Sequence, residues 1–187
     1  ATKKEKDIRG MLVEKSMEYV LTHGHEPGSV FLFMKELKMD ESKFYEYYGS
    51  FEAIKKSIWM RFMEDTIHAV KGDSVYSEYS TREKMLAFYF TLIERLKQDR
   101  SYVHHTVHNR MKNKEMMPSF LKPFRQTFID FANEIINEGI EQEEIAKRPI
   151  ISDRYKDALW LQLIFLVGFW LKDESTGFQK TDAAIEK

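Results

Sequence analysis

Three histidines lie close together in the segment 104–108, and their spacing could support metal binding. His104 and His108 are four residues apart, so on a helix they share one face, which is a spacing that can chelate zinc. A third ligand would have to come from elsewhere, with Glu94 and Glu115 as the candidates. Because no glutamate directly follows His104, we interpret these histidines as polar-face or pocket-lining residues that could change charge near neutral pH. We therefore expect no metal site.

Sequence patterns for catalysis are missing from the chain. There is no cysteine, which excludes a thiolate nucleophile, thiolate metal ligands and disulfides. A Gly-rich phosphate loop, a Gly-x-Ser-x-Gly elbow and an HExxH zinc motif are also missing. The paired carboxylates Glu143 and Glu144 lie in a polar, turn-like stretch and are interpreted as solvated. We predict that the protein is not an enzyme and has no cofactor; a small helical enzyme or metal-binding bundle is the alternative that metal analysis would test.

The composition is that of an ordinary globular protein. Of the 187 residues, 43% are hydrophobic and 32% are charged, and the formal net charge is -1. This net charge does not favour a polyanion as a partner. The longest apolar run, residues 163–171, is about half the length that spans a bilayer as a helix. Because the charged residues 1–7 contain no apolar signal segment, we expect a cytoplasmic protein without membrane contact.

Apolar residues recur at three- and four-residue steps along most of the chain, which predicts helices. The 8 glycines and 4 prolines gather between these segments, and no segment alternates with the two-residue period of a strand. We therefore predict an all-α fold, with a three-helix helix-turn-helix head followed by a helical-bundle domain. The predicted helices cover residues 4–22, 29–37, 41–47, 50–70, 81–95, 102–112, 118–138 and 153–172, with a further helix start at Thr181.

Residues 29–47 have the layout of a helix-turn-helix. Ser29 and Asp40 are suited to cap the two short helices, and residues 38–40 form the tight connection between them. A longer predicted helix precedes this pair. The best domain boundary in the chain follows later, at residues 71–74.

At the end of residues 29–47 and directly after them, a tyrosine, a second aromatic residue and a Gly/Ser turn follow one another: Tyr45, Tyr48 and Gly49-Ser50. The surrounding residues extend the pattern: Gly24, Ser29-Val30, residues 33–37 and 39–50, and Glu52-Ala53-Ile54. As a set, covering roughly a third of the chain, they resemble the TetR/AcrR family of bacterial transcriptional regulators. In that family the recognition helix ends in a tyrosine, an aromatic residue follows three positions later, and a short turn leads into a long linker helix.

The resemblance implies a ligand-responsive homodimeric regulator, with repression as the expected sign. Its recognition helix would lie in the major groove of double-stranded operator DNA, and a dimer would place two such helices about 34 Å apart. The head would be residues 1–48, the linker helix residues 49–72, and the ligand-binding and dimerisation domain residues 73–187. The residues that match DNA-facing positions of the family are Ser29, Lys43, Tyr45, Tyr47 and Lys55.

Three positions depart from the family pattern. Met34 replaces a small alanine, Lys38 replaces a glycine, and Phe51 replaces a lysine that touches phosphate. Residues 1–60 contain ten Lys/Arg and ten Asp/Glu, whereas phosphate binding favours a positive excess. Three of these acids lie on or beside the recognition helix: Asp40, Glu41 and Glu46. The alternative is therefore a ligand- or protein-binding helical dimer whose head has lost DNA binding.

Aromatic residues at helical spacing in the second part of the chain indicate a core, an interface or a pocket. We expect a pocket for a small apolar or aromatic effector, lined by Phe88, Phe90, Tyr102, His105, Phe124, Phe128 and Phe165. The resemblance implies that the last two long helices pack against their symmetry mates as a four-helix bundle. The residues expected in that dimer interface are Tyr155, Trp160, Leu163, Val167 and Trp170. Gly168 would allow a close approach of the helices.

Overall fold

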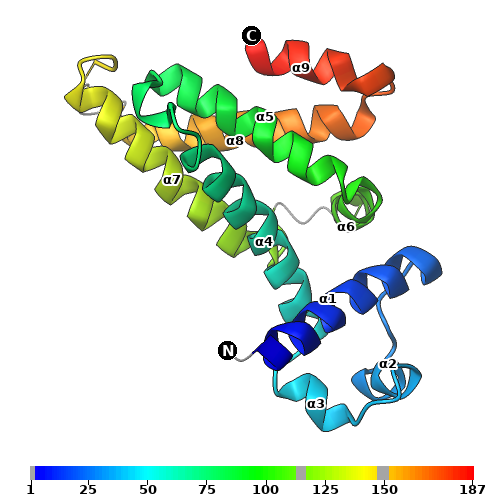
Figure 1. Ribbon diagram of the computed structural model, residues 1–187. Coiled ribbons are helices and arrows are strands. Elements are labelled where there is room, and N and C mark those ends of the chain that lie inside the picture. The colour runs from blue at the N-terminus through cyan, green and yellow to red at the C-terminus, as the bar shows by residue number, and fades with distance from the viewer. Residues whose placement is uncertain (1–2, 113–116, 147–151) are drawn as a thin grey trace. The chain divides into compact units, whose positions relative to one another are not determined.

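The computed structural model describes residues 3–112, 117–146 and 152–187, and in these ranges every regular element is a helix (Figure 1). The predicted all-α fold class is confirmed. The elements are α1 (Lys3–His23), α2 (Val30–Glu36), α3 (Glu41–Tyr45), α4 (Phe51–Lys71), η1 (Tyr76–Glu78), α5 (Thr81–Lys97), α6 (Arg100–Lys112), α7 (Leu121–Glu141), α8 (Ser152–Lys172), η2 (Thr176–Phe178) and α9 (Gln179–Glu186).

Local capping explains why α5 begins at Thr81, as the sequence predicts. The Ser80 hydroxyl accepts the amide proton of Glu83, and the Glu83 carboxylate in turn accepts the amide proton of Ser80 at 2.8 Å. This reciprocal capping box satisfies two amides that the first helical turn would leave unpaired. Hydrogen bonds from the side chain and then the backbone of Ser80 lower the pKa of Glu83, which keeps the cap ionised.

The residues form two compact units, which are described separately. The first contains residues 1–60 and 101–121, and the second contains residues 61–100 and 122–187. The α4 helix contributes residues to both.

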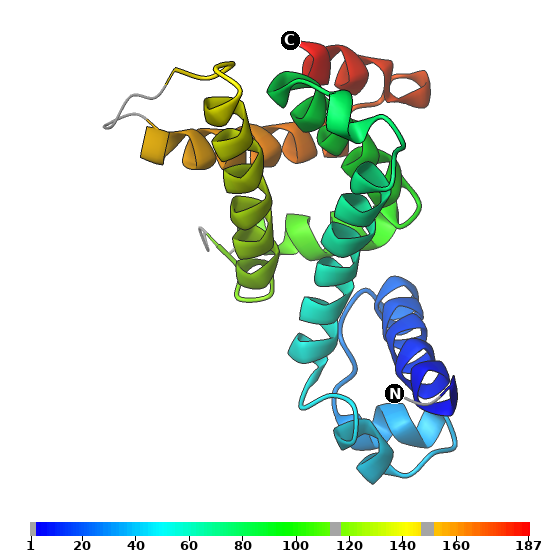
Figure 2. The same cartoon turned by 60° about the vertical axis from the view of Figure 1, so that its left-hand side comes forward.

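In the first unit, α1 lies across α2 and α3 in both views of the ribbon (Figures 1 and 2). Apolar side chains from α1, α2, α3 and the start of α4 fill the space between these helices. The most completely buried are Leu12, Phe33, Met34, Phe44 and Ile54. Met34 therefore belongs to this core, at the position where the TetR/AcrR pattern described above has an alanine.

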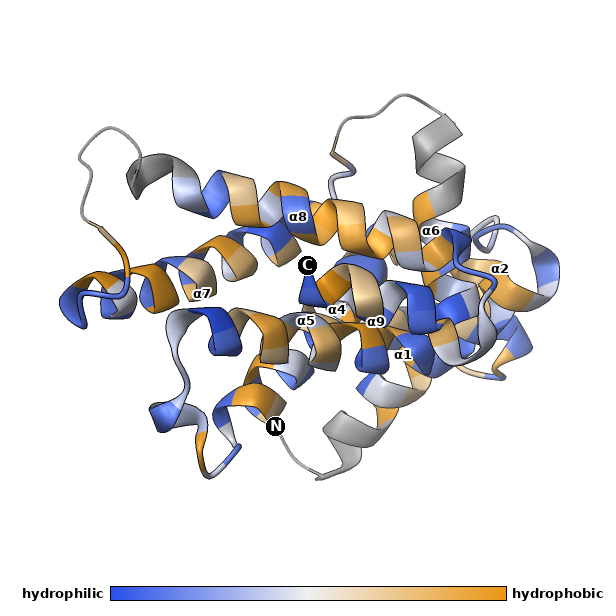
Figure 3. Cartoon of the chain, turned by 90° about the horizontal axis from the view of Figure 1, so that it is seen from above, coloured by the Kyte–Doolittle hydropathy of each residue, from blue (hydrophilic) through white to orange (hydrophobic). Residues whose placement is uncertain are grey.

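In the second unit, α9 packs against α5 and α8. The α7 helix contributes an aromatic face, because the ring centroids of Phe88 and Phe128 lie 5.4 Å apart and those of Phe128 and Trp160 lie 5.8 Å apart. Along α8, apolar residues occupy much of the circumference (Figure 3). In the described part of the chain, no helix is both long enough and apolar enough to cross a membrane.

A buried carboxylate anchors the turn that leads into α9. Asp173 is 5% exposed and accepts hydrogen bonds from the backbone amides and hydroxyls of Ser175 and Thr181, at 2.6–2.9 Å. Burial acts to raise the pKa of Asp173, but these four hydrogen bonds outweigh it and hold the pKa well below the usual range. Asp173 thus fixes the position of a short helix that would have little stability alone.

Candidate nucleic-acid interface

The connection between α2 and α3 is a tight turn closed by backbone hydrogen bonds. The amide of Met39 donates to the carbonyl of Met34 at 3.0 Å, and Lys38 adopts a left-handed conformation with φ of 55°. Glycine adopts this conformation most readily, whereas for a residue with a side chain the conformation costs roughly 1 kcal/mol. The turn therefore has a conformation that favours glycine, the residue of the TetR/AcrR pattern at this position, although this chain carries lysine.

Three aromatic side chains hold α2, α3 and the start of α4 together. The Phe51 ring lies 5.3 Å from Phe33 and 5.2 Å from Phe44, centroid to centroid, and both contacts are edge-on. Phe33 and Phe44 are almost fully buried. Phe51 thus contributes to the aromatic core of the helix-turn-helix, at the position where the TetR/AcrR pattern described above has a lysine.

Burial of Phe44 turns the opposite face of α3 outward. This face carries Ser42, Lys43 and Tyr45, and the Tyr45 side chain is 54% exposed. The structure therefore leaves two of the five predicted DNA-facing residues, Lys43 and Tyr45, accessible on one surface.

Both exposed residues already have acidic partners within the helix. Lys43 Nζ donates to the Glu46 carboxylate at 2.7 and 2.9 Å, and this hydrogen bond is the main cause of a raised Lys43 pKa. The Tyr45 hydroxyl donates to Glu41 at 3.3 Å. Desolvation is the main cause of a raised Tyr45 pKa, and the negative charge of Glu41 raises this pKa further. A phosphate or base that approached Lys43 would compete with Glu46 for its ammonium group.

Ser29 and Tyr47 flank the same helices. Ser29 is exposed, and its Oγ accepts the Leu32 amide at 3.1 Å as the N-cap of α2. The cap predicted from the sequence is confirmed, and the hydroxyl proton is still available to a phosphate. Tyr47 is partly exposed. Asp40 precedes α3 as predicted, but its side chain forms no capping hydrogen bond.

The structure contradicts the prediction that Lys55 contacts DNA. Lys55 is 8% exposed, and its Nζ lies within ion-pair distance of Glu26 and 3.2 Å from Glu52. It also lies 5.3 Å from the centroid of the Phe120 ring. A buried and doubly paired ammonium group cannot reach a phosphate. Sequence reasoning failed here because Glu26 and Phe120 are far from Lys55 along the chain.

Tyr48 has a structural role in the head. Its buried ring lies 5.3 Å from the Arg9 guanidinium, and its hydroxyl accepts hydrogen bonds from Arg9 and Ser57. Tyr48, the second aromatic residue of the TetR/AcrR pattern, thus joins α1 to α4 through these contacts.

The residues predicted to line one effector pocket lie in three different settings. Phe88 on α5 and Phe124 and Phe128 on α7 are buried in the core of the second unit. Phe90, also on α5, is partly buried. Phe165 is 61% exposed.

Tyr102 and His105 instead line a cavity of about 290 Å³ in the first unit, together with Lys55 and Glu26. Burial, followed by the charge of Lys55, lowers the pKa of His105. This cavity does not bring the seven predicted residues together, and the single aromatic pocket stays a prediction. A larger cavity lies elsewhere, between α5, α7, α8 and α9.

The predicted dimer-interface residues also need correction. Trp160, Leu163, Val167 and Trp170 are at most 9% exposed, so these side chains belong to the protomer core, while Tyr155 is partly exposed. The face of α8 that is accessible carries other apolar residues instead: Leu161, Ile164 and Phe165, with 67%, 45% and 61% exposure. The prediction placed the interface on the buried face of α8, because this helix is apolar on several sides and its sequence alone does not distinguish them.

Of the predicted histidine pair and its candidate ligands, the side chain of His108 and Glu115 lie outside the described residues. Among the side chains that the structure describes, no group of three or more His, Cys, Asp or Glu residues is close enough to hold a metal ion.

Comparison with known proteins adds the family context. The family model described as "Tetracyclin repressor-like, C-terminal domain" matches residues 84–187, more than half of the chain. A search of curated proteins gave no match.

Solved structures share the fold at low sequence identity. A protein from Syntrophomonas wolfei str. Goettingen, assigned to the TetR family of transcriptional regulators, superposes with a TM-score of 0.74 at 16% identity, over 96% of this chain and 91% of its own. A protein of the same assignment from Shewanella sp. PV-4 gives 0.63 at 14% identity, over 95% of both chains. A protein of unknown function from Rhodococcus sp. RHA1 gives 0.61 at 12% identity, over 96% of this chain and 92% of its own.

Proposed function

Since the chain belongs to the tetracycline repressor-like (TetR) family of transcriptional regulators, we propose that it represses transcription by binding operator DNA as a homodimer. In this proposal residues 1–48 form the DNA-binding head, residues 49–72 the linker, and residues 73–187 the regulatory and dimerisation domain. A small-molecule effector shifts the protein between DNA-competent and incompetent states. The protein is assigned to the cytoplasm, where its operator is.

The observation that carries the proposal is the helix-turn-helix. Its buried Phe44 fixes α3 so that Lys43 and Tyr45 face outward, which suits insertion of a short helix into a major groove. Ser29 at the start of α2 and Tyr47 after α3 are proposed as flanking phosphate contacts. The Lys55 side chain is left out of this set because it is buried.

The experiment is a salt series of DNA-binding measurements by fluorescence anisotropy, with duplexes from the region upstream of the gene. We expect affinity to fall with salt, and the Lys43→Ala variant to lower the slope of log K against log salt by about 1. Lys172→Ala, an exposed lysine at the end of α8, is the matched control and should bind like the parent. If no duplex shows salt-dependent binding at low ionic strength, the regulator proposal fails.

A homodimer is proposed to form through the exposed face of α8. Leu161, Ile164 and Phe165 lie at the i, i+3, i+4 spacing of one helical face, and each is at least 45% exposed. On the same helix, a methyl group added at Gly168 would meet nothing within 4 Å in the protomer, so a second helix could approach closely there. Contiguous exposed apolar surface of this kind is typical of an interaction site.

The second candidate function is an effector- or protein-binding dimer with a head that no longer binds DNA. The Lys43–Glu46 ion pair favours it, because the acid competes with phosphate for the cation on α3. The Glu46→Gln variant separates the two candidates. If the head binds DNA, this variant should bind several-fold more tightly than the parent; if parent and variant both fail to bind, the second candidate is supported.

A further inference from the structure

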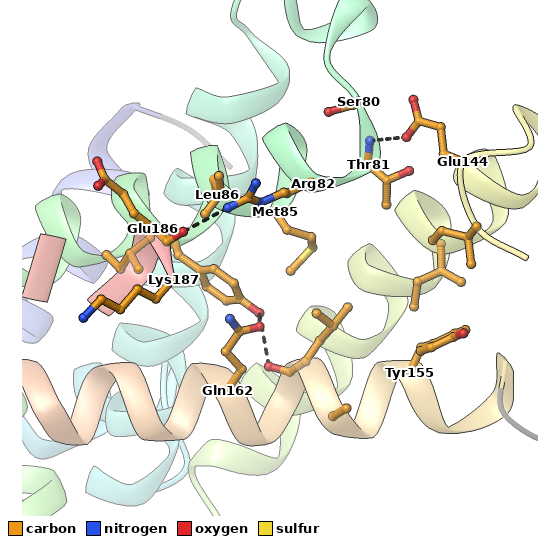
Figure 4. Close-up of a pocket in the computed structure, with 16 residues that line it drawn as sticks. Ser80, Thr81, Arg82, Met85, Leu86, Glu144, Tyr155, Gln162, Glu186 and Lys187 are labelled. Atoms are coloured by element: carbon orange, nitrogen blue, oxygen red, sulfur yellow. Dashed lines mark hydrogen bonds between the residues drawn. The ribbon is translucent and has the colours of Figure 1, made fainter. Parts of the chain in front are cut away.

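A cavity of about 450 Å³ lies in the second unit, between the start of α5, the end of α7, the first half of α8, and α9 (Figure 4). This volume falls within the range of about 300–1,000 Å³ that is typical of small-ligand sites. None of the aromatic residues predicted to form a pocket lines it, although Tyr155 does.

The inner wall of the cavity is mostly apolar. Four of its lining side chains are buried in the protomer: Met85, Tyr89, Ile136 and Ile185. The single hydroxyl proton of Tyr89 is shared between the Leu159 carbonyl at 3.3 Å and Gln162 Oε1 at 3.2 Å, so it already has acceptors within the protein. This wall suits the apolar body of a ligand, which gains free energy by leaving water.

One side of the cavity carries Arg82. Figure 4 shows Arg82 on this side, together with Glu186 and Lys187. An Nη2 proton of Arg82 is donated to the backbone carbonyl of Glu186 at 2.9 Å. Within the described residues, no carboxylate forms an ion pair with Arg82, so the rest of its guanidinium is available to a ligand. The planar fork of arginine matches the two oxygens of a carboxylate.

The other side of the cavity is acidic. There Glu144 accepts the backbone amide proton of Thr81 at 2.7 Å, and this hydrogen bond is the main cause of a lowered Glu144 pKa. Glu144 therefore stays ionised at neutral pH and would repel a second anion. The two sides thus give the cavity a polarity that orients a ligand with one negative end.

We propose that this cavity binds an amphipathic carboxylate, with its carboxylate group at Arg82 and its apolar body along Met85 and Tyr89. The inference deepens the proposed function by naming the chemical class of the effector, and it rests on that function only for the effect of binding on DNA affinity. Because α9 forms part of the wall, a bound ligand would also stabilise the docking of α9.

The test compares three probes that share one apolar chain and differ in the end group: decanoate, 1-decanol and decylammonium. Each is titrated calorimetrically into the full-length protein at neutral pH, below the concentration at which it aggregates. We expect decanoate to bind about fivefold or more tightly than 1-decanol, as one partly exposed ion pair would give, and also more tightly than decylammonium, whose ammonium group is repelled by Arg82.

Two pairs of variants locate the binding. Arg82→Gln should remove the preference for decanoate over 1-decanol, whereas Arg61→Gln, at an exposed arginine of α4, should retain it. Ala158→Trp should weaken all three probes at least tenfold by filling the cavity, whereas Ala183→Trp, on the outside of α9, should not. Circular dichroism of each variant shows whether it retains the helical fold.

The proposal is overturned if 1-decanol binds as tightly as decanoate, if Arg61→Gln acts like Arg82→Gln, or if Ala158→Trp has no effect. It is also overturned if no probe binds. Because the titrations contain no DNA, a protein that distinguishes the probes but never binds DNA would support this inference and contradict the proposed function.

Discussion

Replacing the buried Lys55 by alanine should destabilise the first unit and leave DNA recognition by the folded head unchanged. Lys55 is 8% exposed and is paired with Glu26, from the loop before α2, and with Glu52, from α4. The Lys55→Ala variant would leave these two carboxylates facing each other across the space that the ammonium group had occupied. It would also remove the contact with the Phe120 ring.

The expected cost follows from how far water can reach the two acids. Losing one partner of a fully buried ion pair costs about 3–5 kcal/mol, because a charge is left without compensation. The side chains of Glu26 and Glu52 are 41% and 30% exposed, so water can solvate them after the substitution. We therefore expect a loss of about 1–3 kcal/mol in the free energy of unfolding.

The assay is urea unfolding at one fixed protein concentration, followed by tryptophan fluorescence and by circular dichroism. Trp59 is a suitable reporter, because it is buried and its ring lies 5.8 Å from Phe120 in the same unit. Lys55→Met keeps most of the aliphatic stem and separates the lost charge from the lost packing. Lys43→Ala is the exposed control and should change stability by less than about 1 kcal/mol.

The reasoning would be refuted by a Lys55→Ala variant that unfolds at the same urea concentration as the parent. It would be refuted more strongly if that variant also lowered the salt slope of DNA binding by about 1, as a lost phosphate contact does. In that case Lys55 would leave its ion pairs to reach DNA.

Three further predictions concern the core, the dimer and the pH dependence of stability. Phe44→Ala removes a fully buried ring at the centre of the head and should cost about 3–5 kcal/mol in a urea titration, with loss of DNA binding. Phe165→Glu places a charge on the exposed face of α8, so light scattering should show monomers at concentrations where the parent is dimeric; an unchanged mass would argue against this interface. The lowered pKa of Asp173 means that its contribution to stability is present above the unfolded-state pKa of about 3.9 and is lost as the pH falls below it. Asp173→Asn should therefore destabilise the docking of α9 at neutral pH, and the difference from the parent in thermal unfolding should shrink on acidification. If parent and variant differ by the same amount in thermal unfolding at neutral and at acidic pH, the role assigned to the Asp173 carboxylate is contradicted.

Features that depend on residues close together in the sequence were predictable. The start of α5 at Thr81 follows from Ser80 and Glu83, which interact within one turn. The start of α2 follows in the same way from the Ser29 cap. The helix-turn-helix was recognisable because its turn and its caps lie within a few residues of each other.

Features that depend on distant residues were not predictable from periodicity alone. The α8 helix is apolar on several sides, so its sequence does not indicate that Trp160 faces inward and Phe165 outward; the packing of α7 and α9 decides this. Burial of Lys55 depends on Glu26, from the loop before α2. The cavity near Arg82 is lined by residues from four helices, and the sequence of any one of these helices does not indicate that a cavity is present.

The position of Phe51 limits how this head can evolve. Phe51→Lys would restore the phosphate-binding residue of related proteins, but it would take an aromatic ring away from Phe33 and Phe44. If the head binds DNA as proposed, Phe51→Lys would add a phosphate contact and remove core packing, so it would need a compensating change in the core. Glu46→Gln removes no core packing, because Glu46 is exposed. The substitution also removes the charge that holds the Lys43 ammonium group. For a head that binds DNA as proposed, tighter binding is therefore easier to reach by substitutions on the surface of α3 than by Phe51→Lys at the start of α4.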